Sequence, residues 1–399
     1  MPRFSLFVAS LLCWVAALGG AAASPLTDAR EAFYRRIAVQ AALQFAQPTF
    51  FTYSPHSDPQ ERAASTVAIN GHVLLEAHRA TGEPALLAQA RSAGDSLIAH
   101  GDMNGDGKVG WGRYWKLSGP SGDNRGGNTT FARGCVFPRN AAYDDEMYDN
   151  ARIVHFFLDL YHVTADVRYL RVARQAVDDT WEQGESTHGG HGFSYFKTIG
   201  PCDRGWQIKN INMLMAVPLA MLAQITEETR YRQRAEQLIY LERQELNRNF
   251  NGRSTPNLGY YTIETMGAKA QSGGYVPAAQ SLSPEEPVTC NPSTLSGESC
   301  SRHLGLEARG LYMAGRMLGY PRDEFSHEIR SIMLGFRDGA LCRLERSPVG
   351  LPRSVTACVA YYCALRQIDP HFDDLCYIRV LSWPVGTQDI ILGLFWGAR

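Results

Sequence analysis

A helical hairpin that recurs along the chain is the sequence feature that most restricts its possible folds. Each copy contains an apolar helix, a short break and a second helix, and three segments share this pattern: 72–90, 153–173 and 214–235. A fourth, looser copy covers 304–336 and is broken at 319–321. Helical hairpins that recur in this way bury their apolar faces on their neighbours, so we expect one continuous helical assembly.

The two helices of a hairpin differ in where their apolar side chains lie. The segment 153–161 is apolar on nearly every side, which predicts burial all round. The following helix places its apolar residues on a single stripe, formed by Leu170, Ala173, Val177 and Trp181. We therefore predict inner helices surrounded by outer ones, in an all-α toroid of the six-hairpin (α/α) type. The sequence contains no convincing run of alternating strands, and short aromatic stretches are expected to form loops or hairpins at the rim.

The first 23 residues have the composition of a secretory signal peptide. Arg3 supplies a positive charge, the segment 6–18 is apolar apart from Ser10, and small residues follow up to Ser24. The apolar run is shorter than the roughly 20 residues that a membrane-spanning helix needs. We therefore expect cleavage after Ala23, export to an extracellular or periplasmic location, no membrane span in the mature chain, and a single toroid domain over 24–399.

The cysteines and the charge balance agree with an exported globular protein. Of nine cysteines, Cys13 lies in the leader, and the even number that remains predicts disulfide bonds, with Cys290 and Cys300 as one local pair. No Cys-x-x-Cys pair with a matching histidine spacing indicates a zinc site. Lys and Arg number 39 against 40 Asp and Glu, whereas nucleic-acid binders carry a strongly basic surface. We expect a monomer that binds no nucleic acid.

Four acidic residues stand directly before the apolar inner helix of the second hairpin: Asp144, Asp145, Glu146 and Asp149. An acidic residue at a helix start is favoured by capping and by the helix dipole, but a cap needs only one. Cleavage of a glycosidic bond needs two carboxyl groups, one as acid and one as nucleophile or base. Asp145 and Asp149 would share one side of a helix, whereas Asp144 and Asp145 can converge only from an irregular turn.

Aromatic residues recur after the outer helices, where the rim of the ring is expected. Such side chains can stack on the apolar faces of sugar rings, or they can simply pack the rim. A histidine in the same region can hydrogen-bond a sugar hydroxyl or act as an acid/base, or it can be an ordinary loop residue. The expected substrate contacts of this kind are Trp111, Tyr114, Tyr148, His191, Phe193, Tyr195 and Tyr260.

A second motif has the spacing of a calcium-binding loop. Oxygen-bearing side chains occupy positions 1, 3 and 5, glycine occupies position 6, and a residue that offers its carbonyl follows: Asp102, Asn104, Asp106, Gly107 and Lys108. Position 12 is Arg113 instead of glutamate, so a carboxylate from elsewhere must complete the shell. We expect a structural Ca²⁺ here, with a turn rich in Asp, Asn and Gly as the alternative.

The acidic cluster and the segments after it resemble glycoside hydrolase family 76. The likeness covers about 141–261 and rests on the Tyr-Asp-Asp-Glu run 143–146, the helix end 160–166, the glycine-rich stretch 189–193 and the Lys-Asn-Ile-Asn run 209–212. The resemblance implies an (α/α)6 barrel, α-1,6-mannanase activity, catalysis by Asp144 and Asp145, and substrate contacts from Lys209 and Asn210. The interval from the aspartate pair to the hairpin break is about one helical turn longer than in the family pattern, which makes Asp149 the alternative acid.

The leading hypothesis is a secreted glycoside hydrolase that cleaves an α-linked polysaccharide such as mannan. Asp145 is expected to act as acid/base and Asp144 as nucleophile or partner. The first alternative is a polysaccharide lyase or unsaturated uronyl hydrolase on the same ring, with basic partners for a uronate at Arg113, Lys197, Arg204 and Lys209. The second is a non-catalytic secreted protein that binds carbohydrate or a host partner, because one fold hosts many functions.

Overall fold

Helical hairpins dominate the structure. The computed structural model describes residues 25–45, 64–102, 107–111, 129–131, 135–137, 147–184, 209–247, 269–271, 274–276, 298–329, 362–368, 372–374, 376–377, 380 and 388–396. The hairpins are α3 (Ala64–Thr81) with α4 (Pro84–Ala99), α5 (Met147–Thr164) with α6 (Val167–Gly184), and α8 (Lys209–Thr226) with α9 (Thr229–Asn247). They are accompanied by α2 (Pro25–Ala42), the 3-10 turn η1 (Leu43–Phe45), α12 (Glu298–Met317) and α16 (Gln388–Trp396).

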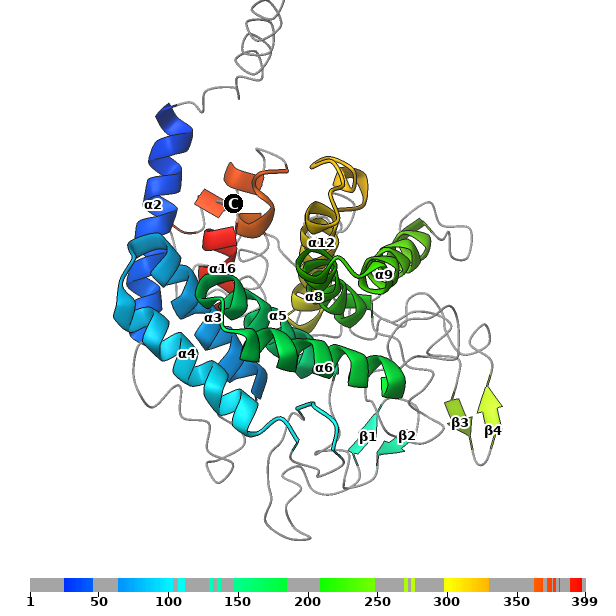
Figure 1. The fold of residues 1–399 in the computed structure, drawn as a ribbon. Coiled ribbons are helices and arrows are strands. Elements are labelled where there is room, and N and C mark those ends of the chain that lie inside the picture. Colours follow the sequence, from blue (N-terminus) through cyan, green and yellow to red (C-terminus); the bar gives the residue numbers. More distant parts are fainter. Residues whose placement is uncertain are drawn as a thin grey trace, which may run out of the picture.

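The helices form a ring in which one helix of each hairpin faces inward (Figure 1). Along the inner layer α3 contacts α5, α5 contacts α8, and α8 contacts α12. Helices α4, α6 and α9 each pack on the inner helix of their own hairpin. The C-terminal helix α16 contacts both α2 and α3, so the end of the chain closes the ring against its beginning. The predicted all-α toroid of helical hairpins is confirmed.

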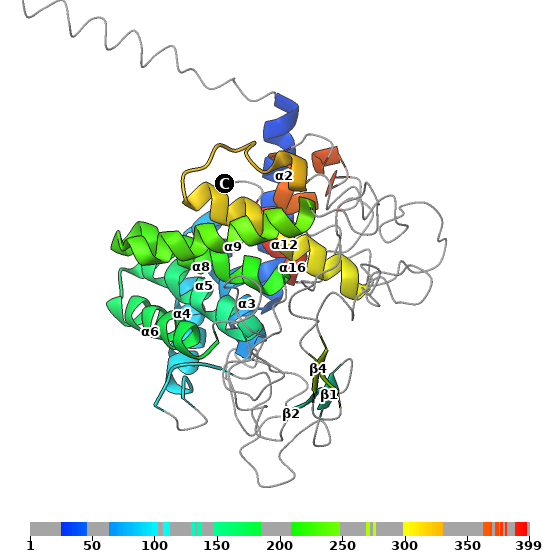
Figure 2. The same ribbon diagram turned by 90° about the vertical axis from the view of Figure 1, so that its right-hand side faces the viewer.

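Two short antiparallel hairpins accompany the helices. Strand β1 (Thr129–Phe131) pairs with β2 (Cys135–Phe137), and β3 (Lys269–Gln271) pairs with β4 (Gly274–Val276). Both hairpins lie on the same side of the helical ring (Figure 2). Strands within the described residues are thus limited to short hairpins outside the helical layers.

The inner helices are buried on all sides, as predicted. Every residue of 151–160 and of 211–220 is buried, and between 64 and 77 only Thr66 is partly exposed. The outer helix α6 is amphipathic instead, because Ala173 and Val177 are buried while Arg171 is exposed. The difference between inner and outer helices therefore follows from their hydrophobic patterns.

The three hairpins turn through the same local structure. A threonine donates its hydroxyl to the carbonyl four residues earlier, and its oxygen accepts the backbone N–H two residues later, at Thr81, Thr164 and Thr226. The residue after each threonine is in the left-handed region, with φ of 74° at Gly82, 55° at Ala165 and 60° at Glu227. One left-handed residue is a common way to end a helix, and here it lets the outer helix start two residues later.

A tyrosine at the start of an outer helix links that helix to the preceding outer one. Tyr169 of α6 donates its hydroxyl to Asp95 of α4 at 2.9 Å, and Tyr231 of α9 donates to Asp178 of α6 at 3.0 Å. Burial, followed by the hydrogen bond with Asp95, raises the pKa of Tyr169 to about 12. The hydroxyl is therefore a donor at neutral pH, and the repeat places the same contact twice around the ring.

Glycines let the inner helices approach one another closely. A Cβ atom on Gly310 of α12 would lie 2.5 Å from the carbonyl oxygen of Met213 in α8. A Cβ atom on Gly71 of α3 would overlap the ring of Phe156 in α5. Because backbone atoms cannot give way as a flexible side chain can, the α8–α12 contact requires glycine at position 310.

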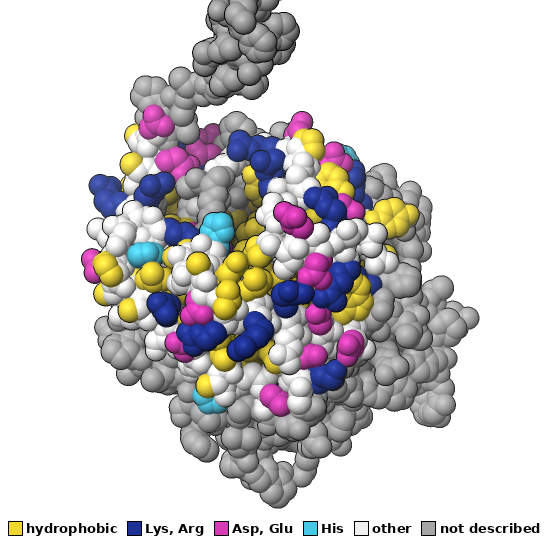
Figure 3. Space-filling model, in the orientation of Figure 1, with side chains coloured by type: hydrophobic (Ala, Val, Ile, Leu, Met, Phe, Trp, Pro, Cys, Tyr) yellow, Lys and Arg dark blue, Asp and Glu magenta, His cyan; other side chains and the backbone are white. Residues whose placement is uncertain are grey.

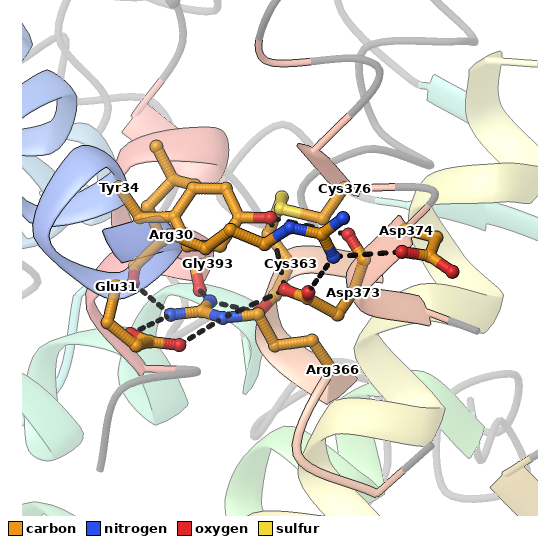
Figure 4. A network of polar contacts seen from close by, with 10 residues as sticks. Arg30, Glu31, Tyr34, Cys363, Arg366, Asp373, Asp374, Cys376 and Gly393 are labelled. Atoms are coloured by element: carbon orange, nitrogen blue, oxygen red, sulfur yellow. Dashed lines mark hydrogen bonds and ion pairs between the residues drawn. A yellow bond between two sulfur atoms is a disulfide. The ribbon is translucent and has the colours of Figure 1, made fainter. Parts of the chain in front are cut away.

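A polar clasp joins the two ends of the ring (Figure 4). The Arg366 guanidinium donates to both carboxylate oxygens of Glu31 in α2, at 3.0 and 2.8 Å, and to the carbonyl oxygen of Leu394 in α16 at 3.2 Å. In the same network, Arg30 of α2 donates to Asp373 at 2.5 Å and to Asp374 at 2.8 Å. Arg366 is buried, and its guanidinium N–H groups bind acceptors in both α2 and α16.

A disulfide bond reinforces the same region. Cys363 and Cys376 are bonded, and the loop between them carries Arg366, Asp373 and Asp374. The prediction of disulfide bonds is thus confirmed for one pair. The predicted partner Cys290 lies outside the described residues, and the side chain of Cys300 is not described, so their pairing stays a prediction.

The described surface carries charges of both signs side by side (Figure 3). Arg168 pairs with Asp166 at 2.7 Å, and Arg230 pairs with Glu228 at 2.8 Å and with Asp178 at 3.0 Å. Exposed pairs of this kind contribute little stability. Among the helices that the structure describes, none has the length and apolar character needed to cross a membrane.

The hairpin breaks predict a stabilising substitution. We expect Ala165→Gly to raise the free energy of unfolding by roughly 0.5–1 kcal/mol, because the left-handed conformation is unfavourable for alanine and the greater freedom of unfolded glycine offsets only part of the gain. Ala88→Gly on the exposed side of α4 should instead lower it by about 1 kcal/mol. Urea denaturation of both variants measures the difference, and a loss of stability in both would contradict the expectation.

The clasp predicts that stability depends on Arg366. We expect Arg366→Met to lower the free energy of unfolding by about 3 kcal/mol, because Glu31 and three backbone carbonyls lose their common donor. The control is Arg322→Met, because Arg322 is exposed and donates to Gln367 at 3.3 Å. We expect its urea midpoint to stay close to that of the wild type. Equal midpoints for the two variants would show that the clasp does not hold the ring closed.

Candidate functional site

A cluster of polar side chains lies between the inner helices α3 and α5. His72 of α3 is hydrogen-bonded through Nε2 to Oδ2 of Asp159 in α5. His155, one helical turn before Asp159, places its Nε2 3.5 Å from the same oxygen. Arg79 donates to the other carboxylate oxygen, Oδ1, at 3.0 Å and also pairs with Glu76. The cluster therefore combines two imidazoles, two carboxylates and one guanidinium in the interior of the ring.

The charge on Asp159 is stabilised by its neighbours. Burial by itself would raise the pKa of this carboxyl, but His72, Arg79 and His155 together hold the pKa well below its usual range. Arg79 keeps a raised pKa despite its burial, because Asp159 and Glu76 lie next to it. The Asp159 carboxyl is therefore ionised at neutral pH and is held by one guanidinium and two imidazoles.

The C-terminal helix covers this cluster with an aromatic ring. The Trp396 ring meets His72 edge to face at 5.6 Å and lies nearly parallel to His155, with 6.3 Å between ring centroids. The guanidinium of Arg309 in α12 lies 3.1 Å from the centre of the Trp396 ring, a cation–π contact. Four helices far apart in the sequence, α3, α5, α12 and α16, thus meet at one point.

A polar stripe runs along α5 from Asp149 in its first turn to Asp159. Asp149, Arg152, His155 and Asp159 are spaced by three or four residues, so they share one side of the helix, and all four are buried. Because His72 lies by His155 and Arg79 lies by Asp159, α3 and α5 run in the same direction. The stripe therefore connects the helix start, where Asp149 lies, with the cluster near the helix end.

The first turn of α5 contains two of the predicted residues that the structure describes, Tyr148 and Asp149. Asp149 is completely buried, and Tyr148 is half-buried beneath the Arg152 guanidinium, which lies 5.4 Å from the ring centre. Asn150 donates from Nδ2 to the carbonyl oxygen of Trp111 at 3.3 Å. The structure therefore brings the first aromatic stretch next to the start of the inner helix, as expected for a rim segment.

Trp111 itself requires a correction. Its ring has no exposed surface, its indole N–H donates to the carbonyl of Leu97 at 2.9 Å, and it meets Phe157 edge to face at 5.6 Å. The packing alternative therefore holds for this residue, because a ring enclosed by α4 and α5 offers no face to a sugar.

Most of the other predicted site residues lie outside the described residues. These are Asp144, Asp145, Asn104, Asp106, Tyr114, His191, Phe193, Tyr195 and Tyr260. Lys209 and Asn210 form the first two residues of α8, as expected for the entry to an inner helix, but their side chains are not described. Their roles stay predictions.

The predicted calcium loop is described at its two ends. Asp102 is exposed and accepts the backbone N–H of Gly107 at 3.1 Å. Two carboxylates of α6 lie next to the loop. Asp179 accepts the N–H of Val109 at 2.7 Å and lies 3.7 Å from the Lys108 ammonium, and Glu182 accepts from that ammonium at 2.8 Å. These contacts are those of a stabilised turn, and Ca²⁺ binding by Asp102, Asn104, Asp106 and Lys108 stays a prediction.

The sequence reasoning missed His72, His155 and Asp159. Because the segment 153–161 is apolar on nearly every side, its pattern predicts burial and assigns no role to His155 and Asp159. A signal was present, because polar residues at 149, 152, 155 and 159 share one helical face within an otherwise apolar segment. Their meeting with His72 had no local signal, since 87 positions separate His72 from Asp159.

Three solved structures with a similar fold are distant from this chain in sequence. No protein-family model matches the chain, and no curated protein is significantly similar to it. A cellobiose 2-epimerase from Bacillus thermoamylovorans gives a TM-score of 0.56 at 10% identity, over 88% of this chain and 86% of that one. An unsaturated glucuronyl hydrolase specific for heparin gives 0.52 at 12% identity, over 92% and 84%.

A third similar structure is an α-1,6-mannanase of family 76 from a Salegentibacter species. It is an inactive variant in complex with α-1,6-mannotriose, and it gives a TM-score of 0.51 at 12% identity, over 92% of this chain and 99% of that one. At these identities the likeness establishes the fold, and the chain shares the (α/α)6 toroid of these enzymes.

The buried cluster predicts a large effect of removing its cation. We expect Arg79→Met to lower the free energy of unfolding by about 3 kcal/mol, because Glu76 and Asp159 stay buried without their shared guanidinium. Arg91→Met is the matched control, since Arg91 is exposed and lies 3.7 Å from Asp166, and it should change stability by less than about 1 kcal/mol. Urea denaturation with a metal chelator present compares the two, and similar losses would contradict a coupled cluster.

Proposed function

We propose that this chain is an exported glycoside hydrolase that cleaves an α-linked polysaccharide such as an α-mannan. One observation carries the proposal: the adjacent carboxylates Asp144 and Asp145 immediately precede α5, an inner helix that begins at Met147. The first turn of that helix buries another aspartate, Asp149, and its polar stripe continues into the interior of the ring. Acidic residues in this place supply the paired carboxyl groups that glycosidic cleavage needs.

The two adjacent aspartates are assigned complementary roles. Asp145 acts as general acid/base toward the glycosidic oxygen, and Asp144 acts as nucleophile or as the base that activates water. The Salegentibacter mannanase supports this assignment, because the variant named as inactive carries asparagine in place of two adjacent aspartates. Asp149 is the substitute acid if the longer interval before the hairpin break has shifted the acid by one helical turn.

Substrate contacts are assigned to side chains near the starts of the inner helices. Tyr148 is the one whose placement is described, and its half-buried ring beside Arg152 joins an apolar face to a donor group. The remaining assigned contacts are Tyr114, His191, Phe193, Tyr195, Lys209, Asn210 and Tyr260. Aromatic faces together with polar donors are suited to the alternating apolar faces and hydroxyl edges of sugars.

A uronate substrate is the second candidate. Arg152 and Arg309 are buried on inner helices, and buried guanidinium groups are suited to the carboxylate of a uronic acid. The similarity in fold to an unsaturated glucuronyl hydrolase supports the same candidate. An enzyme of that type removes the ultraviolet absorbance of unsaturated uronides, a lyase creates it, and a mannanase does neither.

The proposal predicts a specific pattern of lost activity. We expect reducing-sugar release from an α-mannan to fall by about 10²–10⁴-fold in Asp144→Asn and in Asp145→Asn, because each removes one half of the carboxyl pair. Asp28→Asn, at an exposed position of α2, should retain full activity. If Asp149 is the acid instead of Asp145, Asp149→Asn should lose activity and Asp145→Asn should keep it. Near-ultraviolet circular dichroism confirms that each variant is folded.

Activity is measured on a panel of substrates that includes α-mannan, pectic polymers and unsaturated uronides. Each assay is run once with calcium and once with a chelator. Release from a neutral polymer that survives both Asp144→Asn and Asp145→Asn would refute the assigned pair. If the folded wild type binds sugar but releases none from any polymer, the hydrolase proposal is wrong and the chain is a carbohydrate-binding protein.

A further inference from the structure

We propose that His72, His155 and Asp159 form a binding site for one divalent transition-metal ion of the Zn²⁺ type. Each of the three buried residues offers one ligand atom, and these atoms all lie within 4.8 Å of one another. Two imidazoles and one carboxylate are a ligand set that zinc and related ions prefer. This site is separate from the proposed catalytic aspartates and does not depend on the proposed function.

One of the distances between ligand atoms matches the spacing around a tetrahedral ion. Two ligand atoms that each lie about 2.0–2.2 Å from a tetrahedral ion are roughly 3.4 Å apart. Nε2 of His155 and Oδ2 of Asp159 are 3.5 Å apart, close to that spacing. Nε2 of His72 and the same oxygen are hydrogen-bonded, so they are closer together than two ligands of one ion. Metal binding therefore requires the His72 side chain to move away from Asp159, and two bonds to the metal replace the hydrogen bond.

The scaffold holds the ligands without any loop. His155 and Asp159 are separated by one helical turn on α5, and His72 lies on the neighbouring helix α3. The two imidazole rings are nearly perpendicular, at 86°, with 4.7 Å between their centroids.

The electrostatics of the cluster also suit a cation. Asp159, Glu76 and Arg79 together carry one net negative charge, and both histidines are neutral when they bind a metal. Arg79 bonds Oδ1 of Asp159 and therefore leaves Oδ2 directed at the histidines. All three ligands are at most 5% exposed, so a bound ion would be shielded from water.

A simple histidine–aspartate hydrogen bond is the competing explanation. It accounts for the contact between His72 and Asp159, whereas a metal ion would also use the nitrogen of His155, which lies 3.5 Å from the same oxygen. A metal ion uses all three residues. The role is structural, since Asp159 lies ten residues beyond Asp149, which is about 15 Å along the helix.

Metal binding is tested on the full mature chain after removal of metal with a chelator. We expect equilibrium dialysis against Zn²⁺ followed by elemental analysis to find one tightly held ion per chain. Affinity should fall at least tenfold in His72→Gln and His155→Gln. The matched control is His162→Gln, an exposed histidine of the same helix α5, which should bind Zn²⁺ like the wild type.

A second measurement needs no variant. Co²⁺ added to the metal-free wild type should produce the visible absorption of a tetrahedral nitrogen- and oxygen-ligated ion, and excess Zn²⁺ should abolish it. Excess Ca²⁺ should leave it unchanged, because Ca²⁺ prefers oxygen ligands. The proposal is overturned if no such absorption appears, or if Zn²⁺ uptake is unaffected by His155→Gln. Uptake that is lost in Asp102→Asn but kept in His155→Gln would place the ion in the loop instead and would equally overturn it.

Discussion

Closure of the helical ring depends on contacts between residues more than 300 positions apart. The Arg366 guanidinium joins Glu31 near the start of the described chain to backbone carbonyls of α16 near its end. Arg30 and Tyr34 add further bonds to Asp373, and a disulfide holds the segment that carries these partners. Without this closure α16 would not be held against α3, and Trp396 would not cover the two histidines.

The ring places polar side chains where an ordinary helical core has none. The inner helices are buried on all sides, yet α5 carries a continuous stripe of ionisable residues that begins at Asp149 and ends at Asp159. Burying such groups is unfavourable unless they are paired. Arg79, Glu76 and His72 supply partners at one end of the stripe, so this end is a rigid cluster rather than an open ligand site. The other end, beside the acidic run before α5, is where the proposed substrate site lies.

Much of the fold could be predicted from the residues, because its repeated unit depends on local interactions. The hydrophobic pattern distinguishes inner from outer helices, and the turns at Thr81, Thr164 and Thr226 each lie within one of the three repeated segments. The site was predicted less well. Trp111 is predicted at an exposed rim, but neighbouring helices enclose it. The spacing of residues along the chain does not indicate how deeply a rim segment is buried.

The hairpins, their breaks and the acidic run ahead of α5 follow from local sequence, because these features depend on residues within a few positions of one another. Only the tertiary structure decided which buried polar groups meet. His72 reaches His155 and Asp159 because α3 and α5 pack in parallel at a matching height, and Arg366 finds Glu31 because the ring closes. Such contacts depend on the packing of whole helices, and a helical period records which side a residue occupies but not what that side faces.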